Sequence, residues 1–562
     1  MTPIFTVRGL AKIGQYIAVL AVVASQFMRV GVVEAQSVNG VGVDGDIALR
    51  DARLATGQRI YREGIGTSGE SLKAMGAAQT ALNGKTVACV TCHRRSGFGT
   101  SEGRFTIRPI TGPALFEEQT VAVRSPRIRA QLGSRQRPPY SEALLARAIR
   151  GGIDSAGKPL DPVMPRYEMD DDDLRAVSAY LTTLSAQPSP GVDAEEIHFA
   201  TVVQPGVSPE RRRAMLDVMH AFIRDKGANV RSEERRRDAG TMRMYRAYRK
   251  WVLHVWDLSG PSESWGEQLE SFYRQQPVFA MVGGLGSASW RPIHEFGERF
   301  EIPIVFAQTG LPVVAGFNNY NFYFSKGVQL EAEILAKYLL DKGRPGKIAQ
   351  VYRRSETGSA AAVAFRNALP SGSALEDHVL EGRGDEAFWR TVRAGNPDVV
   401  VLWLGASDLR DVNTLGADVS RPVYLSFESL GGKLPPSGIK AGQNIRLLYP
   451  SDLPPKHEAR LLRSKIWLHN KGISVIDESV QINTLFAMTV LSDAIGHIAD
   501  SFSRDYFAER IEHVVSQAPT PSLFQTVSLG PGQRFAAKGG TIVQVIDGEK
   551  ITLKAISGWI VP

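Results

Sequence analysis

This chain of 562 residues contains two cysteines, and both lie in one pentapeptide, Cys-Val-Thr-Cys-His at residues 89–93. Thiols at this spacing lie one helical turn apart and can bind the same group, so the surrounding fold must leave room for that group. Three groups are compatible with such a pair: a zinc ion, a redox-active disulfide or a covalently attached haem.

The surroundings of the pentapeptide favour haem. A zinc site would need a second pair of ligands at suitable spacing, and the sequence has no second cysteine pair. A thioredoxin-like disulfide would open a helix after a strand, whereas this motif lies in a glycine-rich stretch. One haem c uses every chemical position, because Cys89 and Cys92 form the thioethers and His93 provides an imidazole to the iron.

Residues 1–35 have the layout of a secretory signal peptide. Arg8 and Lys12 precede a short apolar run, and a small-residue pattern predicts cleavage near Ala35. The alternative is a retained anchor, but Arg29 interrupts the apolar segment, which is shorter than the ~20 residues of a spanning helix. We therefore expect a periplasmic protein without a transmembrane span in its mature form. Nucleic acid is excluded as a partner of such a protein despite the net charge of +8.

A proline-rich segment divides the chain. Residues 188–196 are expected to link a loop-rich block, 36–187, to a longer block, 197–562, in which apolar runs alternate with amphipathic helical patterns. Continuous apolar strands between helices indicate parallel sheets covered on both faces, and the length favours two lobes. Strands are predicted at 198–204, 252–258, 278–284, 302–308, 347–353, 398–405, 422–428 and 445–450, followed by a hairpin that turns at Asp547-Gly548.

Residues 51–185 resemble a class I c-type cytochrome. The stretch DARLATGQRIYREG resembles the first helix of that family, with Gly57 and Tyr61 at the packing positions, and DDDDLRAVSAYLTTL resembles its last helix. TGPAL matches the Gly-Pro segment of the family, which implies that the Pro113 carbonyl accepts a hydrogen bond from Nδ1 of His93. The resemblance implies an all-α domain that carries one haem and transfers electrons.

The resemblance also implies the second axial ligand of the iron. Met164 lies in the loop before the last helix, where the family's axial methionine lies, and a thioether there suits electron transfer. The alternatives are that Met164 only fills the core, or that Met169 or Met75 is the iron ligand instead. Met75 lies in an insertion, residues 64–88, that departs from the family pattern, as does an arginine-rich extension at 117–140.

Residues 197–562 resemble type I periplasmic solute-binding proteins of the branched-chain amino acid receptor group. The resemblance is carried by FAMVGGLGSASWRPIHEFGERFEIPIVFAQT and by FYFSKGVQLEAEILAKYLLDKG, where the family's chain crosses to its second lobe. In that fold the ligand lies between two lobes, at strand ends and helix N-termini. The implied ligand-binding residues are Gln204, Gly284, Ser287, Gln308, Thr309, Tyr352, Glu356, Ser407 and Asp408.

The sequence offers no catalytic motif: it has no nucleophile elbow, phosphate-binding loop, zinc-protease motif or dinucleotide fingerprint. We therefore expect an electron carrier and binding protein rather than an enzyme. Its predicted partners are an unidentified small molecule and a periplasmic dehydrogenase or oxidase chain. The alternative function is a solute receptor of an ABC-type transporter with an accessory cytochrome, and the single haem motif disfavours a peroxidase.

Overall fold

The computed structural model describes residues 41–562 except 103–104, 119–136, 239–248, 315, 317, 344–345, 410–411, 416–420, 440–443, 455, 499–500 and 547–550. The predicted signal peptide, most of the arginine-rich extension 117–140 and the Asp547-Gly548 turn therefore lie outside the described residues. Among the helices that are described, none is both long and apolar enough to cross a membrane.

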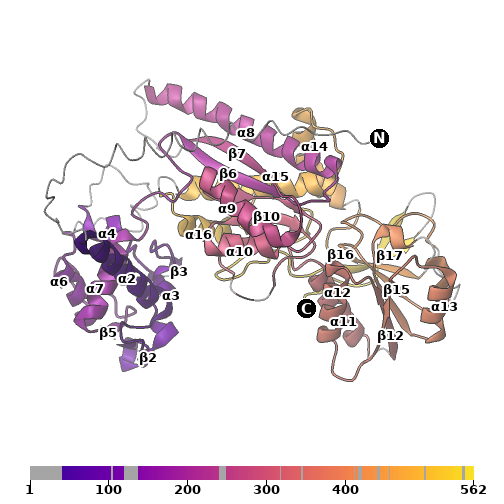
Figure 1. Cartoon of the computed structure of the whole chain (residues 1–562), viewed down its shortest axis with the longest axis horizontal. Coiled ribbons are helices and arrows are strands. Elements are labelled where there is room, and N and C mark those ends of the chain that lie inside the picture. The colour runs from indigo at the N-terminus through magenta and orange to yellow at the C-terminus, as the bar shows by residue number, and fades with distance from the viewer. Residues whose placement is uncertain are drawn as a thin grey trace, which may run out of the picture.

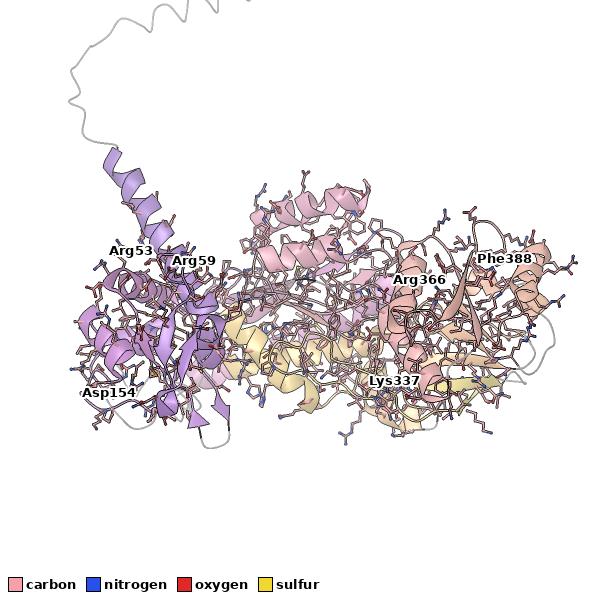
Figure 2. The ribbon with its side chains drawn as sticks, turned by 90° about the horizontal axis from the view of Figure 1, so that it is seen from below. Arg53, Arg59, Asp154, Lys337, Arg366 and Phe388 are labelled. Atoms are coloured by element: carbon pink, nitrogen blue, oxygen red, sulfur yellow. The ribbon has the colours of Figure 1, made fainter. Side chains whose placement is uncertain are left out.

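Three bodies follow one another along the molecule (Figure 1). An N-terminal block lies at one end, a first α/β lobe lies in the middle and a second α/β lobe lies at the other end. Figure 2 shows the same order, with Arg53 and Arg59 on α2 (Val41–Glu63) at one end and Phe388 on α13 (Glu386–Ala394) at the other. A structural change in the N-terminal block can therefore reach the second lobe only through the first lobe.

The N-terminal block is mainly helical. Its helices are α2, α3 (Val90–His93), α4 (Gly112–Phe116), α6 (Glu142–Gly151) and α7 (Asp171–Thr183). It also contains an antiparallel sheet of order β2-β1-β5, formed by Ala81–Asn83, Lys73–Met75 and Arg166–Glu168, and a short hairpin of β3 (Ser101–Glu102) and β4 (Phe105–Thr106). The expectation of an all-α domain therefore holds only in part, because the insertion at 64–88 supplies two of the strands.

The first and last helices of this block pack closely, as the sequence predicted. A Cβ atom added to Gly57 on α2 would lie 2.1 Å from the carbonyl oxygen of Ala176 on α7. The rings of Tyr61 and Tyr180 lie 5.4 Å apart at the same crossing, and Tyr61 is fully buried. Asp170 caps α7, since its side chain accepts a hydrogen bond from the backbone of Asp173 at 2.8 Å. The close crossing explains why a glycine is needed at position 57.

The first lobe is built on a parallel sheet of order β11-β10-β8-β6-β7, with the short β9 between β10 and β6. One face packs against α8, α15 and α16, and the other packs against α9 and α10. The prediction of apolar strands covered on both faces is confirmed. The strands are β6 (Glu196–Val203), β7 (Lys250–Asp257), β8 (Ala280–Val282), β9 (Leu285–Gly286), β10 (Ile304–Thr309) and β11 (Asn321–Tyr323). The helices are α8 (Pro209–Asp238), α9 (Trp265–Gln275), α10 (Arg291–Arg299), α15 (Glu478–Ile498) and α16 (Arg504–Val514).

The second lobe has a sheet of order β13-β12-β14-β15-β16-β17-β18, in which the first five strands are parallel and the last two antiparallel. The sequence did not predict β13, because its ALEDHV stretch lies at the sheet edge and is largely polar. The strands are β12 (Lys347–Tyr352), β13 (Ala374–Val379), β14 (Val399–Trp403), β15 (Val423–Ser426), β16 (Ile445–Tyr449), β17 (Thr541–Ile546) and β18 (Thr552–Ala555). The helices include α11 (Val328–Asp341), α12 (Glu356–Ala368) and α13, and α14 (Lys456–Asn470) follows β16.

The chain passes between the two lobes three times. It leaves the first lobe after β11, returns between β16 and α15, and crosses again between α16 and β17. The first of these crossings lies where the sequence predicted it. The carboxyl ends of β10 and β14 both line a cleft between the lobes.

Candidate functional site

The two cysteines and the histidine of the pentapeptide are held on one helical turn. Cys89 precedes α3, and its carbonyl accepts hydrogen bonds from the backbone N–H groups of Cys92 at 3.3 Å and His93 at 2.8 Å. Both cysteines are half-buried, and no disulfide joins them. The two thiols therefore project from one turn of helix, beside the imidazole that follows.

The His93 ring is oriented by a backbone carbonyl. Nδ1 of His93 lies 3.0 Å from the carbonyl oxygen of Arg108. Removal of the ring from water lowers the pKa of His93 to about 4, although the Arg108 carbonyl opposes this shift. A neutral ring that donates through Nδ1 keeps the lone pair on Nε2, which is the form that ligates a metal ion.

The residue that orients the ring differs from the prediction. The sequence assigned this role to Pro113, and the structure places the carbonyl of Arg108 at Nδ1 instead. Pro113 lies in α4, whose first residue donates a backbone hydrogen bond to Leu184 at 2.9 Å and so holds α4 against the end of α7. The β3–β4 hairpin brings Arg108 back toward the motif, and no sequence pattern indicated that return.

The three candidate methionines occupy different environments. Met169 is 5% exposed and packs in the core with Leu174 and Val177. Met75 is 40% exposed and lies on β1. Met164 is half-buried in a turn whose backbone hydrogen bond to the Asp161 carbonyl measures 3.1 Å. These positions agree with Met164 as the axial ligand, and that assignment stays a prediction.

Tyr167 is a site residue that the sequence reasoning missed. It lies on β5, is buried, and donates a hydrogen bond to the carbonyl of Val87 at 2.8 Å. Burial, and then the proximity of Cys89 and Cys92, raise the pKa of Tyr167. The pairing of β5 with β1 places Tyr167 beside the two cysteines. Because β1 belongs to the insertion at 64–88, that insertion is the only part of the sequence that could have indicated this position.

These residues fit a covalently bound haem. Two thiols lie on one helical turn, a neutral imidazole has Nδ1 paired and Nε2 available, and a thioether lies in a separate loop. The two sulfur atoms would form the thioether bonds of a haem c, and His93 and Met164 would each provide a ligand to its iron.

A second candidate site lies between the two α/β lobes. It is a cavity of about 560 Å³ at the carboxyl ends of the parallel strands, as expected for this class of fold. Four of the predicted ligand-binding residues line it: Ser287, Gln308, Thr309 and Asp408. The remaining five do not contact this cavity: Gln204, Gly284, Tyr352, Glu356 and Ser407.

Two of the five hold the cavity wall in place. The Gln204 amide donates to the carbonyl of Ser289 at 3.1 Å and accepts from the backbone of Ala288 at 3.0 Å. Glu356, on the second lobe, accepts a hydrogen bond from the backbone of Ser289 at 2.6 Å and so joins the two lobes. These side chains position the loop that contains Ser287.

The other three have local roles. The Tyr352 hydroxyl faces Asp377 at 3.5 Å, at the sheet edge. Gly284 adopts a φ of 102°, a conformation that favours glycine, where the chain turns after β8. Ser407 is exposed in a short helical turn beside Asp408.

Three charged residues of the cavity were not predicted: Arg211 on α8, Arg353 after β12 and Glu428 after β15. Burial raises the pKa of Glu428 to about 7, while the nearby Arg211 guanidinium opposes that rise. Arg211 lies in the run ERRRAM, which resembles a solvated helix face, so composition did not distinguish it from its neighbours.

Residues 81–185 match the family model for cytochrome c. This part of the chain is a cytochrome c domain. A comparison of the chain with curated proteins gives no match.

Several solved structures are similar to the chain. An ABC transporter substrate-binding protein from Sphaerobacter thermophilus is 14% identical, with 65% of this chain and 98% of that chain covered and a TM-score of 0.48. A leucine binding protein from Thermotoga maritima is 13% identical over 65% and 99% of the two chains, with a TM-score of 0.46. A branched chain amino acid ABC transporter protein from Thermus thermophilus, solved with bound valine, is 14% identical over 66% and 98%, with a TM-score of 0.47.

The cytochrome c domain packs on the first lobe through the residues that follow its haem motif. Arg94 pairs with Glu512 and Arg95 with Asp505, at 2.5 and 3.2 Å. The next residue, Ser96, donates to Glu509 from its backbone at 3.0 Å and from its hydroxyl at 2.6 Å. All three acids lie on α16.

Aromatic stacking completes the interface. The ring of Phe98 stacks on that of Tyr506 with centroids 4.0 Å apart. A cavity of about 290 Å³ remains between the two bodies, and Val90 of the haem motif lines it together with residues of α16. The turn that carries Cys89, Cys92 and His93 therefore faces the first lobe.

Proposed function

We propose that this protein is an exported electron carrier that holds one haem c in its cytochrome c domain and binds a small molecule between its two lobes. In this proposal, residues 1–35 are a signal peptide removed near Ala35, and the mature protein acts in the periplasm. Residues 36–187 form the cytochrome domain, 188–196 the linker and 197–562 the two-lobed binding domain.

The observation that carries the electron-transfer half is the geometry of α3. Cys89 and Cys92 lie on one turn, and Nδ1 of His93 is paired with a carbonyl at 3.0 Å, which leaves Nε2 for the iron. Bound haem c supplies a reversible one-electron couple, which a Met164 thioether would shift toward the reduced form. The chain's own residues would attach the haem through Cys89 and Cys92, and they orient the His93 imidazole and cover the turn that carries these residues with α16.

The binding half is supported by the cavity between the lobes. Its volume of about 560 Å³ falls in the range of small-molecule sites, and it is lined by both polar and aromatic side chains.

A continuous set of contacts connects the two halves. Glu512 pairs with Arg94, next to His93, and also with Arg534 at 2.7 Å. The carbonyl of Arg534 accepts a hydrogen bond from the backbone of Tyr323 at 2.8 Å, and Tyr323 lines the cavity. A ligand that moves this wall would therefore change the charge environment beside the haem, and the haem would in turn influence ligand affinity.

The haem assignment is tested by producing the full-length protein with haem maturation and extracting it with acid. We expect one haem per chain to stay covalently attached. Cys92→Ala should prevent normal holoprotein from accumulating, whereas the control Thr91→Ala keeps both cysteines and the histidine and should bind haem fully. Full covalent attachment in the Cys92 variant would refute the assignment.

The redox role is tested by mixing the oxidised holoprotein with candidate periplasmic dehydrogenases and their substrates. Rapid haem reduction by one of them supports the electron carrier. Binding to permease subunits without any electron exchange would favour the alternative, a transport receptor with an accessory cytochrome.

A further inference from the structure

Four charged side chains line the cavity between the lobes: Arg211, Arg353, Asp408 and Glu428. Two of them neutralise each other. Arg353 binds Asp408 through two nitrogens, at 2.9 and 2.7 Å, and also donates to the carbonyl of Gly382 at 3.0 Å. Because Arg353 already makes these hydrogen bonds, this pair has few N–H donors left for a ligand.

Arg211 is differently placed. Its nearest acid is Asp477, whose oxygen lies 3.9 Å from Nε, beyond hydrogen-bond distance. The other oxygen of Asp477 accepts hydrogen bonds from Ser479 and Val480, at 2.7 and 3.1 Å. Within the described residues, the guanidinium of Arg211 makes no hydrogen bond. It reaches across the cleft, because a Cβ atom added to Gly431 on the second lobe would lie 3.8 Å from one of its nitrogens.

Glu428 reaches across in the opposite direction. A Cβ atom added to Gly310, on the first lobe, would lie 3.7 Å from one of its carboxylate oxygens. Within the described residues, no hydrogen bond is made to that carboxylate. Arg211 and Glu428 therefore project from opposite lobes into the same space, and each has hydrogen-bonding capacity left for a ligand.

A second carboxyl group lies beneath Glu428. The buried Glu331, on α11, accepts hydrogen bonds from the Ser426 hydroxyl at 2.5 Å and from the backbone of Glu428 at 3.0 Å. Burial is the largest cause of the raised pKa of both glutamates, which is about 7 for Glu428. Near neutral pH Glu428 is therefore only partly ionised and balances only part of the Arg211 charge, and the other acid near that guanidinium, Asp477, lies 3.9 Å away.

Aromatic rings also line the cavity, among polar side chains such as Ser287, Gln308 and Asn483. Phe324 and Phe524 come from one side of the cavity and Phe427 from the other. These rings can bury a hydrocarbon group of modest size next to Arg211 and Glu428.

We propose that the cleft binds a small organic acid, with Arg211 holding its carboxylate, Glu428 beside that carboxylate, and the phenylalanine rings around its apolar body. The inference rests on the proposed function, which makes the cleft a ligand site. A guanidinium matches a carboxylate with two parallel N–H donors. A neutral Glu428 can donate a further hydrogen bond to the same carboxylate, whereas a ligand ammonium beside Arg211 would be repelled.

The test uses calorimetric titration of the full-length holoprotein with lactate, 2-hydroxyisocaproate and 3-phenyllactate, and with phenylalanine as the matched amino acid. We expect at least one of the hydroxy acids to bind, and phenylalanine to bind at least about tenfold more weakly than 3-phenyllactate. Arg211→Gln should weaken acid binding at least about tenfold. The matched control is Arg212→Gln, because Arg212 pairs with Asp257 at 2.8 Å and does not line the cavity.

Glu428→Gln separates acid from amine recognition. The titratable groups that face Glu428 are Arg211 from α8 and Glu331 from α11. For an acid ligand, wild-type affinity should fall between pH 6 and 8 as Glu428 ionises, and the glutamine variant should keep its affinity with a weaker pH dependence. For an amine ligand, the variant should lose binding.

Three results would overturn the inference: tighter binding of phenylalanine, equal behaviour of the Arg211 and Arg212 variants, or no binding of any of the acids. A sugar or amine that binds the cleft independently of Arg211 would refute the acid inference and leave the proposed binding function standing. Failure of a broad metabolite set to bind an intact holoprotein would refute the binding half of the proposed function itself.

Discussion

Glu509 should make the interface between the cytochrome c domain and the first lobe sensitive to pH. Its side chain is 7% exposed, and burial raises its pKa from 4.5 to about 7, even though Ser96 and Arg94 favour the charged form. Between these two pH values the folded protein holds a proton that the unfolded chain releases. The stabilisation is therefore complete below pH 4.5 and is lost as the pH rises through about 7.

The size of the effect follows from the same two values. A shift from 4.5 to about 7 corresponds to about 3 kcal/mol, at 1.36 kcal/mol for each pH unit. Glu509→Gln removes the titration and keeps an oxygen that can accept the Ser96 hydrogen bond. The difference in unfolding free energy between wild type and variant should therefore change by about 3 kcal/mol between pH 4.5 and 7.5, with wild type losing stability as the pH rises.

Urea unfolding at each pH measures this difference with two probes. Haem absorbance reports on the cytochrome c domain, and all eight tryptophans lie at or beyond residue 251, so their fluorescence reports on the lobes. Glu386→Gln, at an exposed glutamate that pairs with Arg390, is the control and should keep the wild-type pH dependence. Parallel pH profiles for wild type and Glu509→Gln would refute the reasoning.

Three further predictions follow from the contacts described above. Met164→Ala should abolish the sulfur-to-iron absorption band and lower the haem potential, whereas Met169→Ala should keep the band, and the reverse result would transfer the ligand role to Met169. Gly57→Ala should lower the unfolding free energy by about 1–3 kcal/mol or more, because its Cβ would clash with a carbonyl at 2.1 Å, whereas Gly151→Ala, which meets nothing within 4 Å, should not destabilise the protein. Glu512→Gln should weaken any shift of the haem potential by a cleft ligand, and an unchanged shift would show that this contact does not carry the coupling.

The alternation of apolar strands and helices predicted the two lobes well. All eight strands expected between residues 198 and 450 are present, because each is a continuous apolar run that requires cover on both faces. β13 was missed because a strand at a sheet edge can be polar. The strands of the insertion, β1 and β2, were missed because they are three residues long and acquire their pairing from β5 and from each other.

The cleft was predicted less completely. Ser287, Gln308, Thr309 and Asp408 line the cavity, since they follow strands whose carboxyl ends meet there. Gln204 also follows a strand, and Glu356 begins a helix. Their side chains, however, accept hydrogen bonds from the backbone of Ala288 and Ser289 and do not line the cavity. The position of a residue after a strand therefore predicts that it lies near the cleft. It does not predict whether its side chain keeps hydrogen-bonding groups free for a ligand.

The sequence alone determined the turn that carries Cys89, Cys92 and His93, because their spacing is a property of one helical turn and depends on no distant contact. Only the tertiary structure decided what surrounds that turn. The carbonyl at His93 comes from a returning hairpin, and Ser96 meets Glu509 across 413 residues of sequence. Arg211 and Glu428 acquire their role in the same way, because burial in a shared cavity, and not their local sequence, leaves each of them without a strong partner.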